Sequence, residues 1–458
     1  MAENEMAPMI GLEIHVSLKS DSKLFCACSA VYGNATPNTN VCEVCTGQPG
    51  AKPMALNEKA IENAVKISLA LGCSVEKDVV MQRKHYWYPD LPSGYQRTSK
   101  PLGVGGVLEK IRIREAHVEE DPGRYDLKTG RTDYNRSGTA LLEIVTDPDM
   151  ESPQQAREWL DQLQSILEYL GATRDEAGST RVDANVSIRG SNRVEVKNIN
   201  SFKGVFTALT YEIARQKNLL KNGLPVIQET RHFDEDRGIT LGMRKKETVA
   251  DYRYIPDPDV PPLALTDGFV AQIQKSLPEL PSQKRARFEK QYGMREEEAF
   301  AICLEKEFAD SFEESAKTSD AKILAPFCRG VVRKQLNYRG LAFKNSKLSA
   351  HILSDLAGMV AAKEVTEKVA EELLIVFLDK GTVPREHAKA AGLLGVQKGG
   401  ELEAAAEAVI KENPKAVADF LAGNEKSLHF LAGQLMKATK GKAAVHEVHA
   451  VLKKKMGK

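Results

Sequence analysis

A proline-rich segment divides this chain into two parts that differ in secondary structure. Four of the eight residues from 255 to 262 are prolines. Proline fixes φ and has no N–H to donate, so we expect this segment to continue neither a helix nor a sheet. Before it, short alternating apolar patterns separated by Gly and Pro predict mixed α+β structure. After about Leu277, Ala, Glu, Lys and Leu are frequent, which favours helical bundles.

The length and composition are those of a folded protein with several domains. At 458 residues the chain exceeds a single ordinary core, and we place the first domain at residues 1–276. Apolar residues make up 42% and the net charge is +1, which argues against capture of nucleic acid by overall charge. The N-terminus has no signal-peptide pattern, and no stretch is apolar enough to span a membrane. We therefore expect a cytoplasmic protein.

Two helices in the first domain have clear end signals. We expect Asn57 to cap a helix over residues 58–71, which Gly72 ends. Ser152 is expected to cap a second helix, whose apolar residues share one face and which Gly171 ends.

Three segments alternate between apolar and polar residues, which predicts strands. In residues 10–16 the polar face carries Glu13 and His15 side by side. Residues 181–188 and 194–199 flank a turn-like Gly190-Ser191-Asn192 and predict a hairpin. The polar face of this hairpin would carry Asp183, Asn185, Glu195 and Lys197. A sheet with one face in water has the same pattern, so the pattern alone leaves both interpretations open.

Four of the seven cysteines lie within twenty residues of one another, at Cys26, Cys28, Cys42 and Cys45. In a reducing compartment such a cluster suggests a metal before a disulfide, and four thiolates can close a tetrahedral zinc site. The alternative is free cysteines that act as small core residues. A zinc ion with four thiolate ligands has no open position for water, so we expect it to be structural.

Two acidic residues are hard to explain as a water-facing surface. Glu143 interrupts the apolar run 140–145, where an unpaired carboxylate would be costly, and Glu119 lies in the acidic stretch 117–121. A divalent cation held by Glu119, Glu143 and His15 would satisfy both, and oxygen-rich ligation favours Mg²⁺. The sequence has no standard phosphate-binding loop, so any ATP site must be of another kind.

Several motifs, in order along the chain, resemble one protein family. They are Gly11-Leu12-Glu13-Ile14-His15-Val16, the four cysteines with Pro37-Asn38-Thr39, Tyr88-Pro89-Asp90-Leu91-Pro92, His117-Val118-Glu119-Glu120-Asp121, Leu142-Glu143-Ile144-Val145, Arg181-Val182-Asp183-Ala184-Asn185, Glu195-Val196-Lys197-Asn198-Ile199-Asn200-Ser201, Asp251-Tyr252-Arg253-Tyr254 and Gly433-Gln434-Leu435-Met436-Lys437. From about residue 9 to its end, the chain resembles GatB, the tRNA-activating component of the GatCAB aspartyl/glutamyl-tRNA amidotransferase.

This resemblance implies a fold and an activity. The expected fold is α+β: a cradle-shaped kinase domain with a mixed or antiparallel sheet and a zinc-bound loop. An all-α domain at 277–399 and a small YqeY-like helical tail at 400–458 that binds tRNA are expected to follow. The implied activity is ATP-dependent phosphorylation of the side-chain carboxylate of Glu-tRNA(Gln) or Asp-tRNA(Asn). Ammonia from the glutaminase GatA then forms the amide, within a heterotrimer that includes the small protein GatC.

The resemblance also implies roles for individual residues. Glu13, His15, Glu119 and Glu143 would be catalytic, with the last three binding Mg²⁺, and the four clustered cysteines would bind Zn²⁺. We assign the nucleotide and phosphate surface to Asp183, Asn185, Glu195 and Lys197. Lysines in the cationic tail, namely Lys437, Lys440 and Lys442, would attract the tRNA backbone. Two rival interpretations are a non-catalytic, zinc-stabilised tRNA-binding scaffold and an independent hydrolase or ligase for small molecules.

Overall fold

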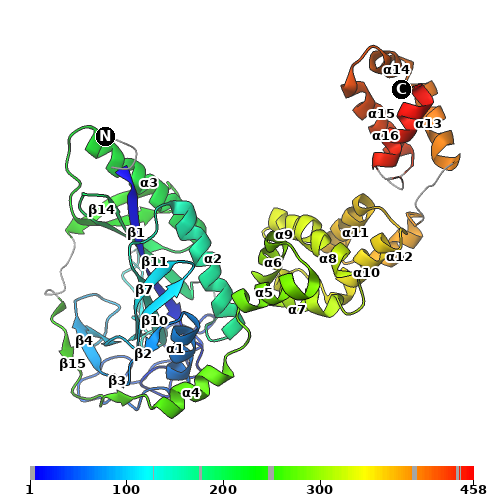
Figure 1. Ribbon diagram of the computed structural model, residues 1–458. Coiled ribbons are helices and arrows are strands. Elements are labelled where there is room, and N and C mark those ends of the chain that lie inside the picture. Colours follow the sequence, from blue (N-terminus) through cyan, green and yellow to red (C-terminus); the bar gives the residue numbers. More distant parts are fainter. Residues whose placement is uncertain are drawn as a thin grey trace. The chain divides into compact units, whose positions relative to one another are not determined.

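The computed structural model describes residues 6–126, 128–174, 178–245, 252–394, 400–439, 443 and 445–457. The chain divides into two compact units, Met1–Leu280 and Pro281–Lys458, and Figure 1 labels many of their elements. None of the described helices is long and apolar enough to cross a membrane. The domain limits that we place at 276 and 399 stay predictions.

A large mixed sheet forms the framework of the first unit. Its central strand β1 (Pro8–Ser17) pairs antiparallel with β10 (Ala140–Thr146) and with β11 (Thr180–Ile188). On the β10 side follow β7 (Ile111–Glu120), β5 (Tyr95–Ser99), β4 (Met81–His85) and β15 (Ile255–Pro256). On the β11 side follow β12 (Val194–Ile199), β13 (Glu229–Asp234) and β14 (Ile239–Lys245). Strands β12 and β13 run parallel, whereas their neighbours along this path are antiparallel.

Short strands complete the first unit. They are β2 (Ser74–Val75) paired with β6 (Gly103–Leu108), β3 (Asp78–Val79) paired with β16 (Leu263–Ala264), and β8 (Arg124–Tyr125) paired with β9 (Thr132–Asp133). Strand β6 also pairs with β7, which joins β2 and β6 to the large sheet.

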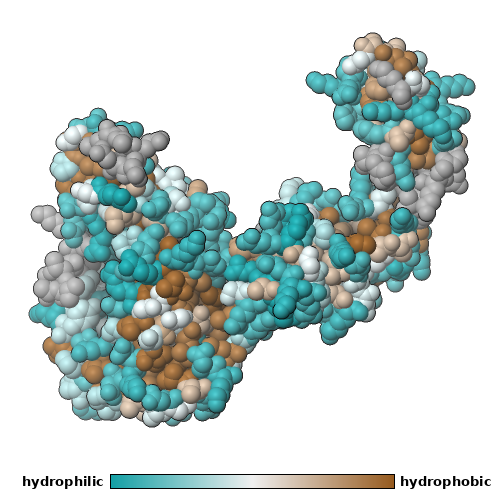
Figure 2. All heavy atoms as spheres, viewed as in Figure 1, coloured by the Kyte–Doolittle hydropathy of each residue, from teal (hydrophilic) through white to brown (hydrophobic). Residues whose placement is uncertain are grey.

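Helices α1 (Glu58–Ala70), α2 (Pro153–Leu170) and α3 (Phe202–Lys221) pack against one face of the sheet. Leu12, Ile14 and Val16 of β1 are fully buried in the core that these helices share. Because side chains alternate along a strand, Glu13 and His15 point to the opposite face. A fourth helix, α4 (Asp267–Ser276), contacts α1. Figure 2 shows apolar residues gathered over the α1 region on the visible face of this unit.

The predicted helix ends are confirmed. The Asn57 side chain accepts a hydrogen bond from the backbone N–H of Ala60, and Ser152 accepts one from Gln155. Gly171 ends α2 with a φ of 59°, a left-handed conformation that glycine adopts without strain. The predicted hairpin is also confirmed, because β11 and β12 pair antiparallel.

One prediction for the proline-rich segment is wrong. Ile255–Pro256 form β15, which pairs antiparallel with β4, so the segment does continue the sheet. Strand β15 is the last strand of the sheet, and a proline is tolerated at an edge where its missing N–H would face away from the ladder. Asp257 anchors the segment, since its fully buried carboxylate accepts hydrogen bonds from Arg83 at 3.0 Å and Arg97 at 2.7 Å.

The second unit is helical, as predicted. Its helices are α5 (Pro281–Tyr292), α6 (Glu296–Cys303), α7 (Lys306–Ser315), α8 (Ala321–Phe327), α9 (Arg333–Arg339), α10 (Ala350–Ala361), α11 (Glu367–Lys380), α12 (Pro384–Ala390), α13 (Gly400–Glu412), α14 (Pro414–Leu421), α15 (Glu425–Ala438) and α16 (Val445–Met456). A turn of π-helix, Cys328–Val332, lies between α8 and α9. The last four helices bury a hydrophobic cluster of their own, which includes Leu402, Leu431 and Leu452. The predicted fold class is therefore confirmed.

Candidate functional site

The predicted magnesium ligands meet on the polar face of the large sheet. His15 of β1 lies directly opposite Glu143 of β10, and Glu119 of β7 is one diagonal step away because it pairs with Leu141. His15 Nε2 lies 3.7 Å from Glu119 Oε2 and 3.7 Å from Glu143 Oε1. Ligand atoms of the three residues all lie within 4.8 Å of one another. We call these three residues the triad.

Burial and mutual repulsion shape the charge of the triad. Burial and the neighbouring charge of Glu119 raise the pKa of Glu143 well above its ordinary value. Burial also opposes ionisation of Glu119, but Lys84 and His15 outweigh it, so the pKa of Glu119 is lowered. Burial lowers the pKa of His15. Glu119 is buried and Glu143 half-buried, so two carboxylate charges this close are costly without a cation between them, and the residues fit a divalent metal ion.

Lys84 of β4 supplies a positive charge beside the triad. Burial disfavours its ammonium form, but the carboxylates of Glu119 and Glu143 outweigh this cost, and the pKa of Lys84 is raised. Its Nζ also lies 4.9 Å from the centre of the Tyr252 ring, a cation–π contact. The sequence analysis missed Lys84, because the polar run Gln82-Arg83-Lys84-His85 has no alternation that would mark it.

A second cation, Arg181 of β11, lies on the other side of His15. The two residues are direct partners in the β1–β11 ladder. The Arg181 guanidinium lies 2.7 Å from Asp121, whose side chain is 2% exposed, and this carboxylate raises the pKa of Arg181. Arg136 approaches the same carboxylate at 3.5 Å. The sequence analysis named Arg181 only as part of a family motif and gave it no role.

The predicted hairpin residues line the same face next to the triad. Asn185 donates a hydrogen bond of 2.8 Å to Glu13, which places Glu13 within the network. Lys197 Nζ lies 3.0 Å from Asp183 and 3.6 Å from Glu195. Burial disfavours the charge of Lys197, but these two acids outweigh it and raise its pKa. The polar face therefore alternates acids with cations across β12, β11, β1, β10 and β7.

The four clustered cysteines converge as predicted. Their sulfur atoms all lie within 4.8 Å of one another, and Cys42 Sγ is 3.9 Å from Cys45 Sγ. A tetrahedral zinc with Zn–S bonds of about 2.3 Å separates its sulfurs by about 3.8 Å, so the cluster can bind zinc. The hydrogen bond from Cys26 lowers the pKa of Cys45 to about 4, whereas burial raises that of Cys28 to about 11.

A buried lysine, which the sequence analysis missed, supports the cysteine cluster. Lys23 is 1% exposed, and its Nζ lies 3.3 Å from Cys45 Sγ and 3.2 Å from the Tyr134 carbonyl. Four thiolates around one Zn²⁺ leave two excess negative charges, and this ammonium offsets one of them.

The tail lysines differ in their surroundings. Lys437 is exposed on α15, whereas Lys440 and Lys442 lie outside the described residues. Lys454 pairs with Glu403 at 3.0 Å and Lys455 with Glu407 at 2.6 Å, so acids of α13 neutralise part of the cationic end.

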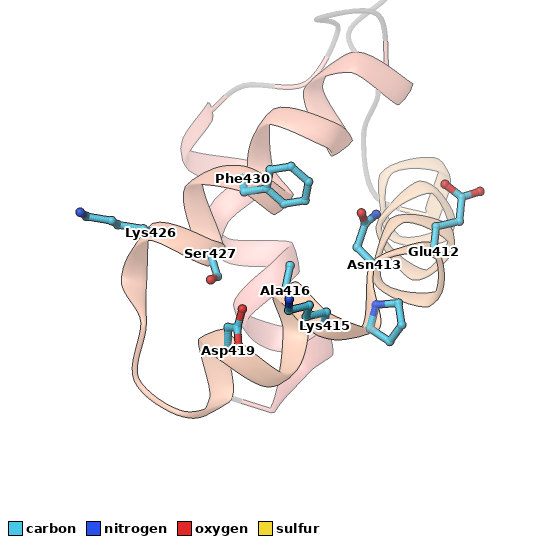
Figure 3. Close-up of a pocket in the computed structure, with 9 residues that line it drawn as sticks. Glu412, Asn413, Lys415, Ala416, Asp419, Lys426, Ser427 and Phe430 are labelled. Carbon is cyan, nitrogen blue, oxygen red and sulfur yellow. The ribbon is translucent and has the colours of Figure 1, made fainter.

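A pocket of about 500 Å³ opens in the tail (Figure 3). It is lined by Glu412, Asn413, Pro414, Lys415, Ala416, Asp419, Lys426, Ser427 and Phe430. Figure 3 shows Lys426 and Glu412 pointing outward, away from Phe430. Two acids and two lysines balance in this lining, which therefore favours neither sign of ligand charge.

Two family models match the chain. Residues 8–271 match the GatB/GatE catalytic domain, and residues 310–456 match the GatB domain. Curated relatives are named as the B subunits of aspartyl/glutamyl-tRNA(Asn/Gln) amidotransferases. The relative from Methanothermobacter thermautotrophicus is 47% identical over 97% of this chain and 99% of its own length. That from Methanocaldococcus jannaschii is 45% identical over 98% of both chains.

The chain belongs to the GatB family of amidotransferase proteins. The family resemblance inferred from the sequence motifs is therefore confirmed over nearly the whole chain. The catalytic-domain match covers every residue of the triad and of the cysteine cluster. The match to the GatB domain covers the tail, including Lys437.

Proposed function

We propose that this chain activates the side-chain carboxylate of an aminoacyl-tRNA by phosphorylation with ATP. The substrate would be Glu-tRNA(Gln), Asp-tRNA(Asn) or both, as the names of the relatives suggest. The observation that supports this most directly is the convergence of His15, Glu119 and Glu143 on the polar face of the sheet. A scaffold without chemistry would have no use for two mutually repelling carboxylates, one buried and one half-buried.

The proposed reaction overcomes the poor leaving group of a carboxylate. A carboxylate oxygen forms a bond to the γ-phosphorus of ATP, and the bond from that phosphorus to ADP breaks. Ammonia then attacks the carbonyl carbon, and the bond from that carbon to the phosphorylated oxygen breaks, releasing phosphate and a proton. The ammonia would come from the glutaminase GatA, in a heterotrimer with the small protein GatC.

In this proposal His15, Glu119 and Glu143 hold Mg²⁺. When bound, this ion supplies positive charge that offsets the repulsion between the anionic carboxylate and the anionic phosphates. Lys84 lowers the pKa of Glu119, and its ammonium offsets the carboxylate charge beside the ion site. Arg181, held by Asp121, presents a guanidinium next to His15 that can stabilise the phosphoryl group as it transfers.

The surrounding residues complete the proposed site. Glu13, fixed by Asn185, orients the polar network beside His15. Asp183, Glu195 and Lys197 form the surface that would face the nucleotide and its phosphates. The cysteine cluster would hold a structural Zn²⁺ that folds residues 26–45, and the tail would add attraction to the tRNA backbone.

The experiment is Glu143→Gln in the complete complex, with ATP-dependent amide formation on both charged tRNAs as the readout. Loss of a metal ligand should lower the rate at least about a hundredfold. Glu115→Gln is the matched control, because Glu115 is on the same sheet but pairs with His117 at 2.9 Å. Activity of Glu143→Gln equal to that of the control would favour the scaffold.

A further inference from the structure

The loop between β4 and β5 exposes two large aromatic side chains. Trp87 is 89% exposed and Tyr88 is 47% exposed, whereas the other tryptophan, Trp159, is 2% exposed. An isolated apolar residue at the surface is ordinary, but adjacent exposed aromatic rings are characteristic of surfaces that bind a partner. The chemistry around the two rings indicates which partner would cover them.

The residue before Trp87 connects this loop to the triad. The Tyr86 hydroxyl donates a hydrogen bond of 3.1 Å to Gln96 Oε1, and Gln96 Nε2 donates one of 3.2 Å to Glu119 Oε2. Tyr86 therefore points toward the triad. Consecutive Cα atoms are about 3.8 Å apart, so the backbone of Trp87 lies one residue from this network.

Two exposed arginines lie on segments that contact this loop, and the guanidinium of one of them, Arg124, lies 5.4 Å from the centre of the Tyr32 ring. The Tyr88 ring packs edge-on against Tyr125, with centroids 6.5 Å apart, and Arg124 directly precedes Tyr125. The Arg253 carbonyl is 3.0 Å from His85 Nδ1, next to Tyr86. Both arginines are exposed, and neither forms an ion pair with a residue that the structure describes. Exposed aromatic rings on a surface that also carries arginines are typical of sites that bind single-stranded nucleic acid.

We infer that Trp87 and Tyr88 stack on the unpaired bases at the 3′ end of the tRNA, with Arg124 and Arg253 at its backbone. This inference rests on the proposed function. The amino acid is esterified to the terminal nucleotide, so its carboxylate reaches the triad only if the last bases lie beside it. Stacking tolerates any base, because every base has a π-face, so the same rings serve different tRNAs with a common end.

The binding test uses the fluorescence of the full-length chain. Because Trp159 is buried, a change in emission on adding RNA reports on Trp87. Emission should be quenched by tRNA with an intact 3′ end, and much less by the same tRNA without its unpaired 3′ nucleotides. Trp87→Phe should abolish the quenching yet keep tRNA affinity within about twofold, since phenylalanine also stacks.

Trp87→Leu separates stacking from simple apolar contact. Leucine keeps the apolar bulk but has no π-face, so the Kd for intact tRNA should rise about tenfold. The substitution lies at an exposed position, and the thermal unfolding profile should match that of the wild-type chain. In the complete complex, KM for the aminoacyl-tRNA should rise with kcat nearly unchanged.

Three outcomes would overturn the inference. They are emission that does not change with intact tRNA, equal quenching by the shortened tRNA, and a wild-type Kd and KM for Trp87→Leu. If GatA and GatC quench the Trp87 emission and RNA does not, the two rings contact a protein partner instead of tRNA. If the wild-type complex forms no amide with ATP, the proposed function is rejected. If the wild-type complex is active and the Trp87→Leu variant behaves like it, only this inference is rejected.

Discussion

Glu119 and Glu143 have different charged neighbours, and this difference sets the charge of the triad. Glu119 is nearly inaccessible, but Lys84 and His15 keep its pKa low. Glu143 has the repulsion of Glu119 added to the cost of burial, so its pKa rises. A cation that binds between them must therefore displace the proton that Glu143 otherwise tends to hold.

Lys84→Met should strengthen Mg²⁺ binding. The ammonium of Lys84 repels a cation bound to Glu119 and Glu143, and its removal should lower the Kd for Mg²⁺ about tenfold. Isothermal titration calorimetry with Mg²⁺ measures this. Lys84→Arg, which keeps the charge, is the control, and equal Mg²⁺ affinity in the Met and Arg variants would contradict the prediction.

Lys23→Met should weaken zinc binding. Lys23 offsets negative charge on the cysteine cluster from a buried position, and methionine is similar in length but uncharged. Competition with a zinc chelator should show an affinity lower by at least about tenfold. Lys19→Met, at an exposed position on the same segment, should leave the zinc affinity unchanged.

At the scale of elements, the edge strand β15 depends on a buried ionic anchor. Asp257 forms ion pairs with both Arg83 and Arg97, and its side chain is fully buried. Burial opposes its ionisation, but the hydrogen bonds from Arg83 and Arg97 outweigh that cost and the pKa of Asp257 is lowered. This anchor connects the start of the proline-rich segment to β4 and β5.

Asp257→Asn should destabilise the first unit by about 3 kcal/mol, because the buried Arg97 and the half-buried Arg83 would share a neutral amide instead of a carboxylate. Denaturant unfolding at pH 7 measures the loss. Asp259→Asn, which changes a more exposed acid of the same segment, should cost less than about 1 kcal/mol.

The pH dependence of the Asp257 contribution follows from the lowered pKa. The stabilisation is fully present above the ordinary aspartate pKa of about 4, and is lost as pH falls through the lower pKa of the folded state. The stability difference between wild type and Asp257→Asn should therefore shrink as the pH falls below about 4. A difference that stays constant down to pH 3 would show that the carboxylate charge is not its source.

At the scale of the whole molecule, the tail helices carry a hydrophobic core of their own. Removal of the chain beyond Gly399 should therefore leave the first unit folded while weakening tRNA binding at least about tenfold. Filter binding at several salt concentrations measures this, and the salt dependence should become less steep because lysine contacts to phosphate are lost. If the truncated chain binds tRNA with unchanged affinity, the tail has no part in tRNA binding and the proposed function does not include it.

Local sequence signals determined much of this protein. Asn57 and Ser152 predicted helix ends because capping depends on neighbouring residues. The alternation in residues 10–16 predicted which side chains share a face, since the two faces of a strand follow from its geometry. The close spacing of Cys26, Cys28, Cys42 and Cys45 predicted that their side chains converge, because all four belong to one short loop.

Only the tertiary structure decided which distant side chains meet. Lys84 reaches Glu119 and Glu143 because β4, β5, β7 and β10 are neighbours in the sheet, and no local pattern specifies that order. Arg181 is next to His15 because β1 and β11 pair in one particular register, which long-range packing sets. The edge strand at Ile255–Pro256 exists because Asp257 finds two arginines far away in sequence. Contacts of this kind depend on the closing of long loops, so they are absent from any short window of residues.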